Sequence, residues 1–284
     1  NTGTAKQILL GGYQFKDADV TPTTGSLTAD IWAGRSVLGN TTTNNTLTVS
    51  GTNHRDAYGG WTAGTRTSAA AKFNSTENTV NLRGGNVRTI YGGFTAVQSG
   101  NATDNKVNIS GGEVGNTGHY GAGYGNVYGG YTAAADGTTN NNTVTLAGGT
   151  VTGTVSGGNR TALGNTLNVN TAARVGRIEN FEKVTFKDAA SKLTLTDTGT
   201  FNLNTLEAGF DATVNEATLV ESANALTLAG GNVFKSELNA DGTKETNLDV
   251  RDGNRRIVRY AYTFKGATAA TTVGSDTWGG RSVA

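Results

Sequence analysis

Aromatic residues recur in one short phrase of this sequence, and they are the side chains best suited to binding chemistry. One set stands directly before a Gly-Gly pair and a second set directly after it, as Tyr58 and Trp61, Tyr91 and Phe94, and Tyr128 and Tyr131. Strict alternation along a strand places the first set outside and the second set inside, whereas a bulge at Gly-Gly inverts one set. In either case each set forms a ladder, which can hold a sugar or a host protein or can simply stabilise successive repeats.

An insertion that ends at Tyr124 carries further side chains of this kind, since it also contains His119 and Tyr120. A regular repeat gains no stability from one long excursion, whereas a binding surface gains a protruding anchor. We therefore predict that His119, Tyr120 and Tyr124 contact a partner beside Tyr91 and Tyr128. The alternative is a loop that folds down over the edge of the repeat.

Carboxylates that could catalyse a reaction occur singly. Enzymes that cleave polysaccharides need paired carboxylates, or an acid held with a base. The isolated acidic residues, which we expect in loops or at corners, are Asp56, Glu77, Asp104, Glu113 and Asp136. We therefore expect no catalytic residues, although a loop-built carbohydrate-active site is the alternative.

Metal ligands are also sparse. The two histidines, His54 and His119, stand in different repeats and are expected in loops near glycine. Neither has carboxylates at a spacing that would complete a zinc site. The acidic turns lack the ligand density of a calcium loop. We expect no metal and no cofactor.

The composition describes a nearly neutral, β-rich chain. The 284 residues include 42 Gly, 1 Pro and 16% charged side chains, which is typical neither of a helical protein nor of a charged disordered tail. The balance of 23 basic against 22 acidic residues gives no field that attracts nucleic acid, so we expect no nucleic-acid partner. The absence of cysteine excludes disulfides and thiolate metal sites.

No apolar run approaches the roughly 18 residues that a spanning helix needs. Asn1 is not a methionine, and no charged-then-apolar leader follows it. We interpret the chain as a mature or excised segment, and we expect any membrane anchor to lie outside it.

Two alternating phrases organise the chain. The first joins an aliphatic residue, an aromatic residue and Gly, as in Ile90–Thr95, and the second begins with Asn and alternates apolar with small polar residues, as in Asn105–Gly111. Recurrence over roughly 20 to 40 residues is typical of a solenoid, in which each repeat buries its apolar face against the next. The glycine pairs that close the second phrase are predicted to turn corners. The side chains predicted to point inward are Leu47, Val49, Val80, Leu82, Val107, Ile109, Val144 and Leu146.

These patterns predict an all-β solenoid of parallel strands with an irregular N-terminal cap and a C-terminal hairpin region. The predicted regions are a cap and first coil (1–40), the Tyr-Gly-Gly repeats (41–164), a narrower continuing solenoid (165–235), and the hairpin with the start of a further repeat (236–284). In the hairpin, 246–250 should pair with 257–262 across the turn at Asp252 and Gly253. The further repeat is marked by Trp278, which begins a phrase like that at Trp32.

The phrases also resemble a known family. Val127–Thr132 leading to Asn142–Gly149, together with Ile178–Val184, is similar to passenger domains of bacterial type V autotransporters, in particular to Gly/Thr/Asn-rich surface adhesins of Gram-negative bacteria. The resemblance covers about residues 30–205. It implies a right-handed parallel β-helix that is secreted through an outer-membrane barrel and displayed on the bacterial cell surface, either anchored or released.

We therefore expect a non-enzymatic adhesin or extended display stalk, whose lateral face binds a host or bacterial surface protein or glycan. The alternative is a carbohydrate-active β-helix enzyme, either a polysaccharide lyase or a hydrolase. Carboxylates that converge in one cleft would favour the enzyme, and a face coated with Thr and Asn would favour the adhesin.

Overall fold

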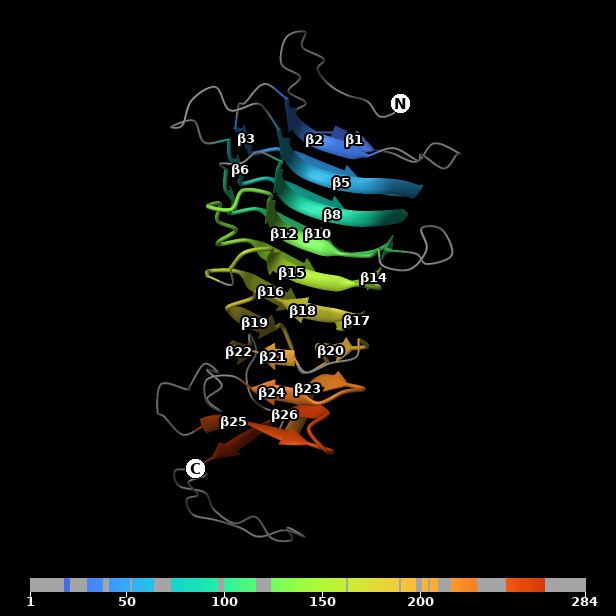
Figure 1. Cartoon of the computed structure of the whole chain (residues 1–284). Coiled ribbons are helices and arrows are strands. Elements are labelled where there is room, and N and C mark those ends of the chain that lie inside the picture. The colour runs from blue at the N-terminus through green and yellow to red at the C-terminus, as the bar shows by residue number, and fades with distance from the viewer. Residues whose placement is uncertain are drawn as a thin grey trace, which may run out of the picture.

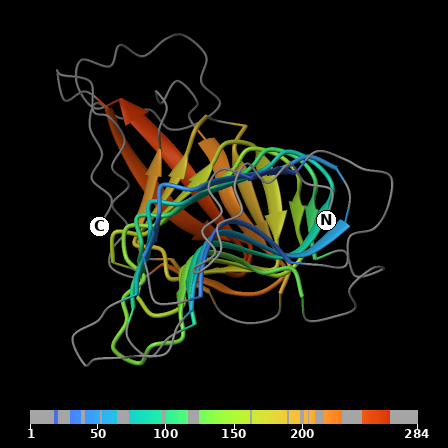
Figure 2. The same ribbon diagram turned by 90° about the horizontal axis from the view of Figure 1, so that it is seen from above.

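The computed structural model describes residues 18–20, 30–37, 41–51, 53–63, 73–96, 100–115, 124–161, 163–188, 190–197, 201–203, 205–208, 216–228 and 244–263. Within these ranges the regular structure consists of strands alone, with no helix. Successive coils of chain stack in sequence order from the N-terminal to the C-terminal end (Figure 1). Seen from above, the strands of successive coils overlie one another around a shared interior (Figure 2).

One parallel sheet, which we call the Thr/Asn sheet, extends along most of the stack, from residue 18 to residue 208. Its strands pair in register, so that Val80, Val107 and Val144 occupy one row. In spatial order the strands are β1 (Ala18–Val20), β4 (Thr46–Val49), β7 (Thr79–Leu82), β10 (Lys106–Ile109), β13 (Thr143–Leu146), β16 (Thr166–Val169), β19 (Lys183–Phe186) and β22 (Thr205–Ala208).

A second parallel sheet, which we call the aromatic sheet, carries the Tyr-Gly-Gly phrases. Its strands along the stack are β2 (Ile31–Ser36), β5 (Asn53–Thr62), β8 (Asn86–Thr95), β12 (Val127–Thr132), β15 (Thr154–Gly158) and β18 (Arg177–Glu179). The first part of β8 also pairs with β11 (Glu113–Val114), which pairs in turn with β14 (Thr150–Val151). A third, short sheet contains β3 (Thr42–Thr43), β6 (Ser75–Thr76) and β9 (Ala102–Thr103).

The C-terminal part changes from parallel to antiparallel pairing. The strands β17 (Ala172–Val175), β20 (Lys192–Leu195) and β23 (Glu216–Ser222) are parallel, and β21 (Phe201–Leu203) pairs with β24 (Leu226–Leu228). The expected hairpin is present as β25 (Lys244–Arg251) and β26 (Arg256–Thr263), and β26 adds antiparallel to β23. The predicted further repeat at Trp278 and most of the predicted cap lie outside the described residues.

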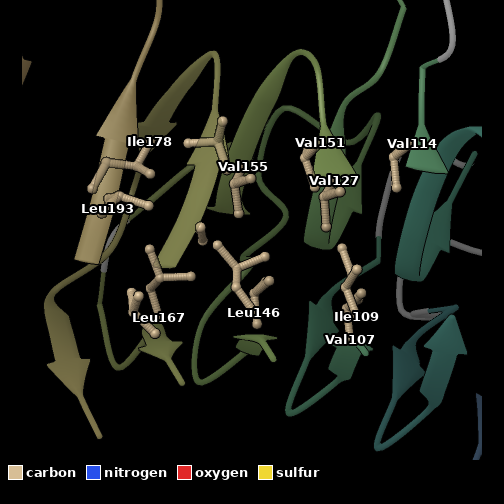
Figure 3. Close-up of a cluster of buried hydrophobic side chains, with 14 of the residues drawn as sticks. Val107, Ile109, Val114, Val127, Leu146, Val151, Val155, Leu167, Ile178 and Leu193 are labelled. Atoms are coloured by element: carbon tan, nitrogen blue, oxygen red, sulfur yellow. The ribbon is translucent and has the colours of Figure 1, made fainter. Parts of the chain in front are cut away.

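Aliphatic ladders fill the interior, as the alternation predicts. Every inward position predicted in the four clearest repeats is at most 2% exposed. Residues such as Val127 and Val155 of the aromatic sheet face these side chains across the coil (Figure 3). Because the same kind of side chain recurs in each coil, each apolar layer is covered by the next.

A column of buried asparagines, which we call the Asn ladder, runs beside these aliphatic rows. Its members begin the second phrase of each coil and are at most 1% exposed: Asn45, Asn78, Asn105, Asn142 and Asn165. The Asn78 Nδ2 and backbone N–H both donate to Asn105 Oδ1, at 3.1 and 3.0 Å. The same pair of bonds joins Asn105 to Asn142. The ladder thereby satisfies the side-chain amides of its internal members, which would otherwise be costly to bury, whereas Asn45 Oδ1 at its N-terminal end has no partner among the described residues.

The Gly-Gly pairs of the first phrase make room for this ladder. A Cβ on Gly93 would lie 2.5 Å from Asn105 Nδ2, and a Cβ on Gly92 would lie 3.1 Å from Asn105 Cβ. The glycines that close the second phrase act differently, since Gly112 has φ +76° at a corner. The corner function expected of glycine pairs therefore applies to the second phrase, whereas the first phrase needs glycine for close packing.

Candidate binding surface

The first aromatic set forms one continuous stack on the outside of the aromatic sheet. Ring centroids are 6.3 Å apart from Trp32 to Tyr58, 5.0 Å from Tyr58 to Tyr91, and 5.3 Å from Tyr91 to Tyr128. The rings are nearly parallel, with interplanar angles of 15°, 7° and 10°. In-register pairing of β2, β5, β8 and β12 aligns these residues coil over coil.

The second aromatic set lies beside the first on the same face. Phe94 and Tyr131 stack at 5.2 Å, and each meets a ring of the first set edge to face, with Tyr91–Phe94 at 5.1 Å and Tyr128–Tyr131 at 5.3 Å. The eight residues of the two columns, which we call the aromatic face, are Trp32, Arg35, Tyr58, Trp61, Tyr91, Phe94, Tyr128 and Tyr131.

Strict alternation is therefore wrong for the second set, and the alternative with an irregularity at Gly-Gly describes the strand. In β8, Tyr91 and Phe94 are both half-buried, while Gly92 and Gly93 between them are both buried. Two consecutive inward glycines turn the next side chain back to the outer face. Both sets consequently reinforce each other through edge-to-face contacts.

An arginine continues the second column at its N-terminal end. The Arg35 guanidinium carbon lies 4.9 Å from the Trp32 ring centre and 4.8 Å from that of Trp61. A cation over indole rings is a favourable electrostatic contact. The column thus ends in a charge that neighbouring rings hold in place.

The faces of the stacked rings contact neighbouring rings, so the stack buries much of its own surface. Tyr58 is itself buried, and its hydroxyl lies 3.5 Å from Asp56 Oδ2. Burial raises the pKa of Tyr58 and Tyr91, and the nearby Asp56 charge raises both further. Burial also raises the pKa of Tyr128. The hydroxyls therefore stay protonated and can both donate and accept hydrogen bonds.

A charged cluster borders the first column. The Arg88 Nε donates to Asp56 Oδ1 at 2.8 Å, and Arg88 Nη2 donates to Asp56 Oδ2. The hydrogen bond to Asp56 raises the pKa of Arg88, and its guanidinium lies 5.0 Å from the Tyr124 ring centre. Asp56, expected in a loop or at a corner, is instead buried in β5, where the Arg88 guanidinium on the adjacent strand β8 reaches it. Arg88 therefore contacts both Asp56, which borders the first aromatic column, and Tyr124, which ends the insertion.

The predicted contact residues are brought together in part. Tyr91 and Tyr128 lie in the first column, and Tyr124, which is 43% exposed, contacts Arg88 of β8, the strand that carries Tyr91. His119 and Tyr120 lie outside the described residues. Of the other residues expected in loops, His54 and Glu113 belong to strands β5 and β11.

A polar groove lies at the corner between the short sheet and the Thr/Asn sheet. Its volume is about 520 Å³. Its lining residues come from four successive coils and are Asn44, Thr46, Glu77, Thr79, Asp104, Lys106 and Asn141. Glu77 and Asp104 are at a corner, as expected. The groove was not predicted as a site, and four of its lining residues each stand directly before a member of the Asn ladder.

Among the described residues, no three His, Cys, Asp or Glu side chains lie close enough to hold a metal ion. No helix in the described part of the chain is long and apolar enough to cross a membrane. Comparison with protein-family models, curated proteins and solved structures finds no match.

Proposed function

We propose that this chain is a non-enzymatic binding module of a bacterial cell surface, of the autotransporter-passenger kind and with a right-handed parallel β-helix. In this proposal it works as an adhesin or display stalk, anchored at the outer membrane or released. Its partner is a host or bacterial surface protein or glycan.

The observation that carries the proposal is the aromatic face. It sets eight side chains in two columns on one lateral surface, and the rings contact one another both within and between the columns. Tyrosine, tryptophan and arginine are the residues that contribute most to binding energy at protein surfaces. Because the rings are already fixed by stacking, binding orders few side chains.

The experiment measures binding of the purified chain to epithelial cells, extracellular-matrix coats and bacterial cells. In the test variant, Tyr91, Tyr128 and Tyr131 are replaced together by Phe, which keeps the stacked rings and removes their hydroxyls. The control carries Thr145→Val and Thr185→Val on the outer side of the Thr/Asn sheet. We expect a loss of binding of about tenfold or more in the test variant alone. No binding by the natural chain, or equal binding by both variants, would refute the proposal.

A carbohydrate-active enzyme is the second candidate, and the groove at the corner favours it. Glu77 and Asp104 line that groove in successive coils beside Lys106, and polysaccharide cleavage requires an acid and a base close together. Incubation with a panel of polysaccharides, followed by detection of new reducing ends or unsaturated sugars, tests this candidate. Product formation that Glu77→Gln abolishes would establish it.

A further inference from the structure

The groove at the corner repeats one position of the coil. Asn44, Glu77, Asp104 and Asn141 each stand directly before a member of the Asn ladder. All four have left-handed backbones, with φ from 55° to 60°. Their side chains are exposed and line the groove together. The groove therefore presents equivalent side chains along the stack, one from each coil.

The backbone that supports these side chains is fixed on both sides. The N–H of Glu77 donates to Thr103 O at 3.2 Å, and the N–H of Asp104 donates to Asn140 O at 3.1 Å, so the corners are joined coil to coil. The next residue in each case is buried and bonded in the Asn ladder. A ligand in this groove meets a preorganised surface and orders little backbone on binding.

The chemistry of the lining selects among ligands. All seven lining residues are polar, so an apolar ligand gains nothing there. Two carboxylates and one ammonium leave one net negative charge, which disfavours nucleic acid and other polyanions. Amides, hydroxyls, carboxylates and an ammonium together both donate and accept hydrogen bonds. This combination suits a neutral ligand that is rich in hydroxyl groups.

We infer that the groove is a binding site for a linear, uncharged oligosaccharide that lies along the solenoid axis. Successive sugar units meet successive coils, with Glu77 and Asp104 accepting hydrogen bonds from sugar hydroxyls and Lys106 donating to sugar oxygens. The site lies on the outer side of the corner, apart from the aromatic face. The inference therefore does not rest on the function proposed for that face.

Two glycine substitutions remove the carboxylates of the groove without straining its backbone. Gly164 occupies the position equivalent to Asn141 in the next coil, with φ +69°. Glu77→Gly together with Asp104→Gly removes both carboxylates, and glycine adopts the left-handed conformation more readily than the natural residues. The matched control is Thr145→Val, which changes the outer Thr/Asn sheet beyond the groove.

Titration calorimetry with cello-, xylo- and malto-oligosaccharides, from disaccharides to hexasaccharides, tests the inference. We expect at least one series to bind, with affinity that rises about tenfold from disaccharide to tetrasaccharide as further coils are engaged. The double glycine variant should lose about tenfold or more, while Thr145→Val and the triple Phe variant of the aromatic face keep the natural affinity.

Failure of all three series to bind at millimolar concentration would overturn the inference. Equal affinity in the double glycine variant, or affinity that does not depend on chain length, would also overturn it. Chromatography of the recovered sugars tests for cleavage. Shortened products would overturn a role in binding alone, because they would show that the groove cleaves the oligosaccharide. Loss of cell adhesion in the triple Phe variant alone concerns the aromatic face and leaves this site untouched.

Discussion

Replacement of Asn105 by Asp gives the sharpest test of the Asn ladder, because it changes hydrogen-bond donors without changing size. Asn105 Nδ2 donates to Ser75 O at 3.0 Å and to Asn142 Oδ1 at 3.1 Å. In Asn105→Asp an acceptor oxygen faces both of these acceptors. Asn105 is 0% exposed, so no water can replace the lost donor.

The expected loss of unfolding free energy is large. A buried polar group left unsatisfied costs about 1–3 kcal/mol, and a buried charge without a partner costs about 3–5 kcal/mol. These penalties overlap in one side chain, so we expect a loss of about 4–6 kcal/mol at neutral pH. This is comparable with the whole stability of a typical domain, which is about 5–15 kcal/mol.

Acid should restore part of that loss. Burial favours the neutral form, so the pKa of the introduced carboxyl is raised in the folded state. The folded chain then binds the proton more tightly than the unfolded chain, and the penalty shrinks as the pH falls through this raised pKa. The protonated acid also regains one O–H donor for Ser75 O or Asn142 Oδ1.

Urea unfolding followed by circular dichroism at neutral and acidic pH measures these free energies. The control is Asn108→Asp on the outer face, where one side-chain bond to Asn81 Oδ1 at 2.9 Å is changed. Its loss should stay below about 1 kcal/mol. Equal losses in the two variants, or a loss in Asn105→Asp that does not depend on pH, would contradict a donor role for the buried amide.

Three further changes test the packing and the ladder. Gly93→Ala places a Cβ 2.5 Å from Asn105 Nδ2 and should lower the unfolding free energy by about 2–4 kcal/mol, whereas Gly84→Ala, with no atom nearer than 3.4 Å, should change it by less than about 1 kcal/mol when both are unfolded in urea. Val107→Asp puts an unpaired carboxylate in a dry aliphatic row and should reduce the melting temperature far more than Thr145→Asp on the outer face; equal melting temperatures would mean that the faces are assigned wrongly. Burial raises the pKa of Tyr91 in the folded state. The stability that this tyrosine contributes is therefore complete below its unfolded pKa of about 10 and is lost as the pH rises further. Tyr91→Phe should consequently weaken the alkaline decline in unfolding free energy.

The aliphatic interior could be predicted from the sequence because its signal is local. Alternation in segments such as Lys106–Ile109 determines which side chains share a face, and burial of Val107 and Ile109 follows from it. In-register stacking then extends the same assignment to neighbouring coils. The parallel sheets were predictable for this reason.

The aromatic face was predictable only in part. In a regular strand, residues three positions apart such as Tyr91 and Phe94 face opposite sides. Here the inward turn of both Gly92 and Gly93 brings Phe94 back to the face of Tyr91. That turn depends on Asn105, which comes from another part of the coil. Likewise, the pairing of Asp56 with Arg88 joins neighbouring coils and has no local pattern.

The Asn ladder and the groove were missed for a related reason. Asn105 and Asn108 are the same residue type, yet Asn105 is buried and Asn108 lies on the outer face of the sheet. Periodicity alone does not separate a polar residue that pairs internally from one that faces water. The left-handed backbone at Glu77 has no sequence signal either, since glutamate does not favour that conformation.

The Asn ladder is one-dimensional, and this decides how changes in it combine. A change at Asn105 breaks the links to both Asn78 and Asn142, so changes at two adjacent internal members break three links rather than four. Their effects on stability are therefore not additive. The spacing between consecutive members is 33, 27, 37 and 23 residues, so coil length does not set the register. A whole coil that supplies its own asparagine and glycine pair leaves the column uninterrupted, which makes duplication or deletion of complete coils the change in chain length that this architecture tolerates best.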